Sequence, residues 1–184
     1  MRFTPQIIPD VLLIEPDVYS DERGYFMETY KQKLLDEALG YQVNFVQDNE
    51  SKSTSKGVLR GLHFQLPPFT QAKLVRVIKG QVLDVAVDIR RNSLTFGKYV
   101  SVELSEKNRK QLFVPGGFAH GFIVLSEEAI FAYKVDAYYS AEHEEGIAYN
   151  DKDVNIDWHF LEKDIILSKA DQNYSNLADN KKLF

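Results

Sequence analysis

Two histidines stand in settings from which a side chain could move protons. His63 lies in the alternating segment Gly61-Leu62-His63-Phe64-Gln65, and His120 follows the glycine-rich turn at 115–119. Imidazole changes charge near neutral pH, so it suits acid–base chemistry. An imidazole that faces the inside of a β-structure needs a partner, since an unpaired buried polar group costs about 1–3 kcal/mol. Taken alone, His63 is thus a hydrogen-bonded core histidine and His120 a turn residue that caps a strand.

The remaining chemistry is limited by composition. His143 stands among glutamates and is expected to be a solvated loop residue, and His159, beside Trp158, is expected to be a packing or surface residue. Cysteine is absent, which excludes disulfides, thiolate nucleophiles, Cys-ligated zinc and iron–sulfur clusters. Any catalysis must therefore use His, carboxylate, Tyr, Lys or Ser side chains.

The elements that must position these residues are mainly strands. Apolar residues alternate with period two over short runs, and clusters of Gly, Pro, Asn and Ser separate the runs. Their close, even spacing is typical of a sandwich, jelly roll or small barrel. The predicted strands are Val11–Glu15, Tyr25–Thr29, Phe45–Asp48, Val58–Gln65, Lys73–Lys79, Val82–Ile89, Lys98–Leu104, Gln111–Val114, Gly121–Leu125, Ala129–Val135 and Ile147–Tyr149.

One helix is expected over Lys31–Gly40, whose leucines form an apolar stripe and whose last residue is a natural C-terminal stop. Apolar residues at 156–161 are expected to pack a further segment against the barrel. The polar stretch Asn173–Lys182 is expected to be mobile. We expect one domain over residues 1–184, with a polar C-terminal tail from about residue 173 to 184.

Charge and hydropathy limit the classes of molecule that the protein could bind. The chain has 184 residues and a formal net charge of -5, with no basic block, which argues against nucleic acid and anionic membranes. It lacks an apolar run of roughly 18 residues and a secretory signal, so we expect a cytoplasmic protein. A small anionic ligand remains compatible with this charge, because a local basic pocket does not show in a net charge.

Two segments resemble the sequence motifs of cupins. Residues 115–120, Pro-Gly-Gly-Phe-Ala-His, resemble the second motif, Pro-x-Gly-x-x-His, and residues 61–65 occupy the place of the first. The resemblance implies a mainly β fold, the cupin-type double-stranded β-helix or jelly roll with a few short helices. Metal-binding cupins carry His-x-His in the first motif, whereas this chain has Gln65 at the second position. Too few ligands remain for a divalent metal, so we expect neither metal nor cofactor.

Six segments resemble the dTDP-4-dehydrorhamnose 3,5-epimerase family, the sugar-nucleotide branch of the cupins. Together they extend the resemblance over roughly residues 5 to 171. They are Asp21-Glu22-Arg23-Gly24-Tyr25-Phe26, Val46-Gln47-Asp48-Asn49, Gly57-Val58-Leu59-Arg60-Gly61-Leu62-His63-Phe64-Gln65, Lys73-Leu74-Val75-Arg76, Asp84-Val85-Ala86-Val87-Asp88 and Gly117-Phe118-Ala119-His120-Gly121-Phe122.

The resemblance implies inversion of carbons 3 and 5 of a 4-keto-6-deoxyhexose linked to dTDP. Both carbons flank a ketone, so loss of either proton gives an enolate, and a base, a cation and an opposing acid suffice without a cofactor. His63 matches the family's base and Asp171 the carboxylate that orients it. Lys73 matches the ammonium that stabilises the enolate, and Tyr133 the acid on the opposite face.

The other matched residues belong to substrate binding. By resemblance they are Arg23, Glu28, Gln47, Asp48, Asn49, Arg60, His120, Tyr139 and Glu145. The arginines suit a diphosphate, because guanidinium offers a planar fork to phosphate oxygens. Tyr139 matches the ring that stacks on thymine, and Tyr138 is the alternative. Glu145 matches an acidic nucleotide-binding position, in a loop one residue longer than usual.

Two positions depart from simple expectation. Strict alternation puts Arg60 and His63 on opposite sheet faces, so both reach one pocket only if Gly61 forms a bulge or the ligand wraps over an edge. The family also places a lysine immediately before the paired aspartate, where this chain has Ala170 and carries Lys169 one position earlier. That binding role is therefore not transferred.

Three other functions stay open at this stage. They are an epimerase acting on one carbon only, a metal-dependent cupin oxygenase or isomerase using His63, His120 and glutamate ligands from elsewhere in the chain, and a noncatalytic sugar-nucleotide binder or regulator. The family also implies a homodimer with exchanged N-terminal strands, in which Arg23 and Glu28 complete the partner's site. The sequence fixes neither the final deoxysugar nor the nucleotide base.

Overall fold

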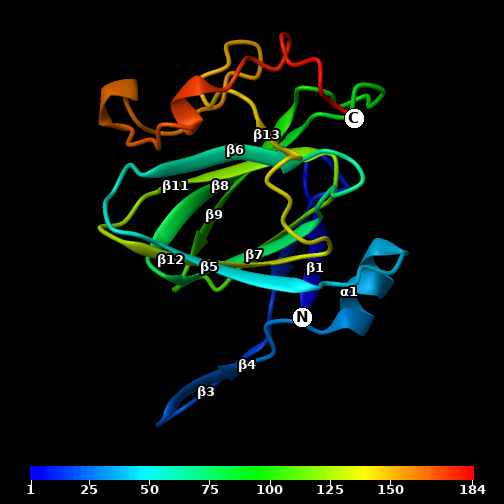
Figure 1. Ribbon diagram of the computed structural model, residues 1–184. Coiled ribbons are helices and arrows are strands. Elements are labelled where there is room, and N and C mark those ends of the chain that lie inside the picture. The colour runs from blue at the N-terminus through cyan, green and yellow to red at the C-terminus, as the bar shows by residue number, and fades with distance from the viewer.

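The computed structural model describes all residues, 1–184, as a mainly β structure with three short helices (Figure 1). The helices are α1 (Gln32–Leu39) and the 3-10 turns η1 (Glu162–Asp164) and η2 (Asp171–Asn173). The strands are β1 (Arg2–Pro5), β2 (Leu12–Glu15), β3 (Val18–Asp21), β4 (Gly24–Met27), β5 (Gln47–Ser53), β6 (Leu59–Gln65), β7 (Lys73–Lys79), β8 (Gln81–Asp88), β9 (Tyr99–Ser105), β10 (Gln111–Val114), β11 (Phe118–Val124), β12 (Ala129–Val135) and β13 (Glu144–Gly146).

Two antiparallel sheets face each other. One has the order β1-β2-β10-β7-β12-β5 and the other β13-β6-β11-β8-β9, so neighbouring strands often come from distant parts of the chain. This is the double-sheet jelly roll that the strand pattern and the cupin-like motifs predicted. Strands β3 and β4 pair only with each other, and their hairpin projects away from the two sheets (Figure 1).

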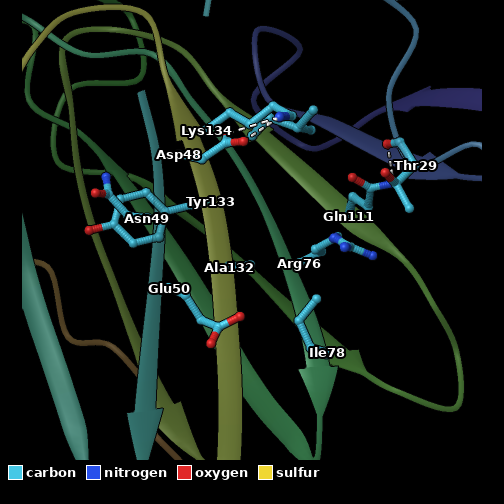
Figure 2. A pocket seen from close by; sticks show the side chains of 11 residues that line it. Thr29, Asp48, Asn49, Glu50, Arg76, Ile78, Gln111, Ala132, Tyr133 and Lys134 are labelled. Carbon is cyan, nitrogen blue, oxygen red and sulfur yellow. Dashed lines mark hydrogen bonds and ion pairs between the residues drawn. The ribbon is translucent and has the colours of Figure 1, made fainter. Parts of the chain in front are cut away.

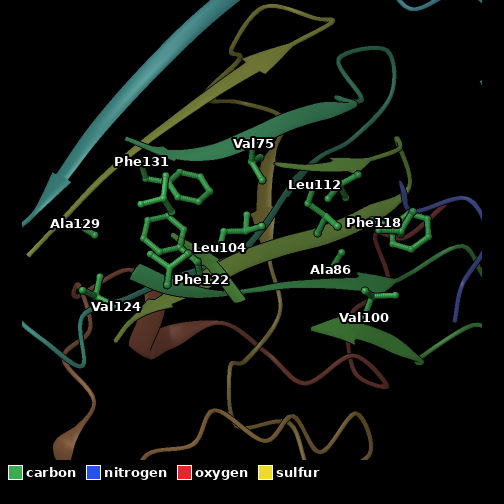
Figure 3. Close-up of a cluster of buried hydrophobic side chains, with 14 of the residues drawn as sticks. Val75, Ala86, Val100, Leu104, Leu112, Phe118, Phe122, Val124, Ala129 and Phe131 are labelled. Atoms are coloured by element: carbon green, nitrogen blue, oxygen red, sulfur yellow. The ribbon is translucent and has the colours of Figure 1, made fainter. Parts of the chain in front are cut away.

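The main core fills the space between the sheets. Val75 and Phe131 from one sheet meet Phe118 and Phe122 from the other, within a cluster of 15 buried residues (Figure 3). The rings of Phe122 and Phe131 stack with their centroids 4.1 Å apart. Both phenylalanines also line a cavity, so the apolar core forms one wall of the polar site described below.

A second core lies on the outer face of the five-stranded sheet. The C-terminal segment covers this face, and its Ile147, Trp158 and Leu177 pack against residues of β6 and β11. Strand β11 is therefore buried on both faces, which explains its nearly continuous apolar sequence. Leu177 is only 4% exposed. The polar stretch 173–182 is therefore anchored to the outer core at Leu177, while most of its other residues are exposed.

Helix α1 covers part of the other sheet. Leu35 packs against Leu12 and Phe113 on the outer face of the six-stranded sheet. The helix ends where its sequence predicted, because Gly40 adopts φ 75° and donates its N–H to the carbonyl of Asp36. No helix in the protein combines the length and the apolar character needed to cross a membrane.

Most predicted strands are confirmed, three of them residue for residue: β7, β10 and β12. The strand predicted over Ile147–Tyr149 is wrong, because Ile147 is buried in the outer core while the preceding Glu144–Gly146 pairs with β6. Strand β5 continues to Ser53, beyond the predicted end at Asp48. Strands β1 and β3 were not predicted from the sequence.

Candidate active site

Two adjoining cavities open between the sheets, with volumes of about 330 and 340 Å³. The first extends toward Gln47, Asn49 and Tyr139, and the second toward Arg60, His120 and Asp171. We refer to the two together as the central cavity. Four residues line both parts: His63, Lys73, Tyr133 and Glu144.

Strand alternation brings Lys73 and Tyr133 together. In the antiparallel pairing of β12 with β7, Tyr133 lies opposite Val75 and Val135 lies opposite Lys73. Lys73 and Tyr133 are therefore diagonal neighbours on the same face of two adjacent strands. Tyr133 also lies directly opposite Asn49 on β5. The predicted base, cation and acid thus line one cavity, as the resemblance implied.

The imidazole of His63 is paired with a carboxylate 108 positions later in the chain. Its Nε2 lies 2.6 Å from Oδ1 of Asp171, whose side chain is only 5% exposed. Burial acts to raise the pKa of Asp171, but hydrogen bonds from His63 and Ser168 outweigh it and lower that pKa. The carboxylate is therefore ionised, keeps the imidazole proton on Nε2 and leaves Nδ1 as the basic nitrogen.

A bulge in β6 allows Arg60 and His63 to face the same cavity. His120 pairs with His63 and Phe122 with Arg60, so two steps along β11 correspond to three along β6. Gly61 takes φ 129° at this point, and a Cβ there would lie 2.6 Å from the backbone of β11. Of the two possibilities left open by the sequence, a bulge at Gly61 or a ligand that wraps over an edge, the structure shows the bulge.

Charges inside the cavity alter one another's protonation. Burial lowers the pKa of Lys73 to about 8, against the opposing influence of Asp84 and Glu144. Burial and the Glu144 carboxylate raise the pKa of Tyr133, which keeps its phenol protonated. His120 Nε2 lies 3.0 Å from both carboxylate oxygens of the fully buried Asp84. The cavity therefore holds a protonated phenol, a readily titrated amine and two carboxylate-paired imidazoles.

One acidic residue of the cavity was missed by the sequence reasoning. Glu144 lines the central cavity and accepts a hydrogen bond from the Tyr139 hydroxyl at 2.7 Å, whereas Glu145 pairs with Lys182 and lines neither part. Glu144 lies opposite the inward-facing Gln65 in the pairing of β13 with β6, so alternation turns Glu145 to the other face. Had the strand been predicted over Glu144–Gly146, the alternation of its side chains would have identified Glu144 as the inward-facing residue.

Asp48 is a second predicted binding residue that does not reach the cavity. Gln47 and Asn49 line the cavity, but the intervening Asp48 faces the outside of the sheet, where it pairs with Lys134 Nζ at 2.9 Å. Figure 2 shows Asp48 and Lys134 together in a polar pocket of about 300 Å³ on this outer face. Matching the three consecutive residues as one group overlooked the alternation of side chains along β5.

Arg23 and Glu28 also lie away from the cavity of their own chain. Arg23 sits in the turn of the projecting β3–β4 hairpin, is paired with Asp21 and has a side chain that is 85% exposed. Glu28 follows β4 and pairs with Lys31. These two predicted binding residues therefore do not contribute to a site within one copy of the chain.

Two pairs of neighbouring candidates differ in whether they line the cavity. Tyr139 lines the cavity, while Tyr138 is 65% exposed and lines neither part. Ala170 lines the cavity beside Asp171, and Lys169 does not. No three His, Cys, Asp or Glu side chains are grouped as metal ligands.

A double-sheet jelly roll with an Asp-paired histidine, a lysine and a tyrosine in its interior defines a cupin-type epimerase. The family model described as dTDP-4-dehydrorhamnose 3,5-epimerase matches residues 5–179. The chain belongs to the dTDP-4-dehydrorhamnose 3,5-epimerase family.

Individual relatives agree with this assignment. The chain is 56% identical over 172 residues to the dTDP-4-dehydrorhamnose 3,5-epimerase of Shigella flexneri, covering 94% of this chain and 93% of the relative. It superimposes on the enzyme of that name from Elizabethkingia anophelis with a TM-score of 0.94 and 52% identity, covering 99% and 98% of the two chains. The dTDP-6-deoxy-D-glucose-3,5-epimerase of Legionella pneumophila was solved in complex with dTDP-4-keto-L-rhamnose. This chain superimposes on it with a TM-score of 0.92 and 48% identity, covering 97% of this chain and 93% of that one.

Proposed function

We propose that the protein converts dTDP-4-dehydro-6-deoxy-D-glucose to dTDP-4-dehydro-L-rhamnose by inverting carbons 3 and 5 of the sugar. The observation that carries this proposal is the convergence of His63, Lys73 and Tyr133 on one cavity, with Asp171 bonded to His63. Membership of the epimerase family and the dTDP-4-keto-L-rhamnose bound to the Legionella relative support the substrate.

The chemistry at each carbon is one proton removed and one returned. His63 Nδ1 takes the proton from carbon 5 or carbon 3, and the C–H electron pair moves toward carbon 4 to give an enolate oxygen. The Lys73 ammonium stabilises that oxygen, and the ionised Asp171 stabilises the imidazolium. Tyr133 then donates its phenolic proton to the opposite face of the same carbon. Before the second inversion the imidazolium releases its proton to solvent and the Tyr133 phenolate regains one from solvent, so the cycle can repeat, and no step needs a metal or a redox cofactor.

Binding of the nucleotide part uses the rest of the central cavity. We assign Arg60 to the diphosphate, because a guanidinium pairs well with phosphate oxygens. Tyr139 is assigned to stacking on the thymine ring, with Glu144 bonded to its hydroxyl. Gln47, Asn49 and His120 are assigned to the sugar nucleotide, since all three line the cavity.

Arg23 and Glu28 join this scheme only in a homodimer, which is part of the proposal. Each copy, folded as one domain over residues 1–184, would extend its β3–β4 hairpin to the partner's cavity. The exposed aromatic rings of this hairpin support the exchange, since Tyr19, Tyr25 and Phe26 are each more than half exposed in the single chain.

Deuterium incorporation from heavy water tests the reaction. Incubation of the thymidine-linked 4-keto sugar with the protein and a chelator is expected to place deuterium at carbons 3 and 5. Incorporation at one carbon only would instead establish the single-carbon epimerase. Activity that the chelator abolishes, together with stoichiometric metal in the purified protein, would support a metal-dependent cupin. Substrate binding without exchange would identify a noncatalytic binder.

A further inference from the structure

Tyr174 lies against the imidazole of His63, yet the mechanism above gives it no task. The two rings meet edge to face, with centroids 5.8 Å apart and an interplanar angle of 69°. Tyr174 also lines the central cavity beside Asp171. An aromatic ring at this distance restricts how the imidazole can turn.

The Tyr174 ring also packs over Gly146. This glycine pairs directly with His63 across strands β13 and β6. A Cβ at position 146 would lie 2.6 to 2.7 Å from three atoms of the tyrosine ring. The backbone of Gly146 does not have a positive φ, so its conformation is open to other residues. Glycine is needed here because a side chain would collide with the tyrosine ring.

The backbone on each side of Tyr174 is fixed by hydrogen bonds. The Asn173 N–H donates to Ala170 O at 3.0 Å within η2, and the Ala148 N–H donates to Ser175 O at 2.9 Å. The first bond belongs to the turn that carries Asp171, and the second ties the segment to the chain that follows β13. The backbone that carries the ring is therefore tied both to the turn of Asp171 and to the segment that follows β13.

We infer that Tyr174 is a positioning residue: its ring packs over Gly146 and against the imidazole of His63, and it holds that imidazole so that Nε2 meets Asp171 while Nδ1 stays available to the substrate. This inference rests on the proposed role of His63 as the base. A displacement of a catalytic group by about 1 Å can cost about 100-fold in rate, so a ring that restricts imidazole tilt acts on kcat. The hydroxyl is not required for this task.

Paired substitutions at Tyr174 test the role of the ring. Tyr174→Ala is expected to lower kcat for deuterium incorporation by about 10- to 100-fold, with KM changed less than about threefold. Tyr174→Phe keeps the ring and is expected to retain nearly full activity. Tyr41→Ala, on a half-exposed tyrosine that does not line the cavity, is the matched control. Circular dichroism of each variant establishes that it is folded.

Gly146→Ala gives a second test that does not remove the tyrosine. The added methyl must displace the Tyr174 ring, so kcat is expected to fall about 10-fold or more. In the Tyr174→Ala background the same change meets no ring and is expected to cost less than about twofold. Losses that multiply in the double variant, or full activity in Tyr174→Ala, would overturn the inference. Absence of exchange by the unaltered protein would instead contradict the proposed function.

Discussion

Asp171 has two hydrogen-bond partners, and they define what the carboxylate does. It accepts from His63 Nε2 at 2.6 Å and from Ser168 Oγ at 2.8 Å. Asp171→Asn is expected to lower kcat by about 100-fold or more, because an amide neither stabilises the imidazolium nor enforces the Nε2 tautomer. Steady-state rates measure this effect. Ser168→Ala is the control: it leaves the charge in place, so the expected loss is below about 10-fold. A loss as large as that of Asp171→Asn would show that the carboxylate's orientation matters more than its charge.

Lys73 gives the reaction a pH limit. Burial lowers its pKa to about 8, and only the protonated ammonium can stabilise an enolate. The charged fraction falls as pH rises, so kcat/KM, which reports the free enzyme, is expected to decrease above about pH 8. The Lys73→Gln variant is expected to lose this alkaline limb together with most of its activity. A profile that stays flat toward pH 10, the range of an ordinary lysine, would contradict the assignment.

The sequence predicted the residues at the centre of the cavity better than those at its periphery. The residues proposed to act on the sugar, His63, Lys73 and Tyr133, stand on strands whose bounds were predicted within a residue. Asp48 and Glu145 do not line the cavity: Asp48 takes the outward position between Gln47 and Asn49, and strand β13, which carries Glu145, was not recognised. On a strand, an error of one position moves a side chain to the other face.

At the scale of elements, the bulge in β6 decides whether Arg60 and His63 share a cavity. Gly61→Ala is expected to destabilise the fold by about 3–5 kcal/mol, because it combines an unfavourable φ with a backbone clash. A Cβ would lie 2.6 Å from Gly121 Cα. Gly24 has nearly the same φ, 128° against 129°, but no neighbour within 4 Å of the added carbon. Gly24→Ala is expected to cost only about 1–2 kcal/mol. Urea denaturation measures the free energy of unfolding of both variants. Equal losses of stability would mean that the φ angle alone, and not the clash, makes glycine necessary at position 61.

Strands that bury an apolar face were predictable, and polar strands were not. Strand β12 alternates clearly and was predicted residue for residue. Strand β5 reads Gln-Asp-Asn-Glu-Ser-Lys-Ser, because its inner side chains line a polar cavity and its outer ones face solvent. It has neither the apolar alternation nor the β-branched residues by which a strand is recognised. Only the pairing with β12 shows that it is part of the sheet.

The whole molecule is needed to assemble the site. His63 comes from the five-stranded sheet, Lys73 and Tyr133 come from the six-stranded sheet, and Asp171 comes from the C-terminal cover. Since Asp171 and Tyr174 reach His63 only when that cover is packed, the buried Leu177 links packing of the tail to the state of the base. The polar tail thus contributes to the support of the proposed active site.

The proposed homodimer makes a prediction that no single chain can satisfy. If Arg23 acts in the partner's cavity, each site combines His63 of one chain with Arg23 of the other. Arg23→Ala and His63→Ala each inactivate a site, but they do so from different chains. In a mixed dimer one site carries both lesions and the other carries neither. Mixing equal amounts after subunit exchange is therefore expected to restore about a quarter of the unaltered activity, since half of the dimers are mixed and each has one intact site.

Arg60→Ala mixed with His63→Ala is the matched control, because both residues line the cavity of their own chain. Every cavity in that mixture carries at least one lesion, so its activity is expected to stay at the level of the separate variants. Sedimentation at micromolar concentration should show dimers in both mixtures. Restoration in neither mixture, with dimers present, would place Arg23 outside the partner's site. A monomer would remove the exchange of hairpins altogether, because an 85% exposed Arg23 on a projecting hairpin would then have no cavity to enter.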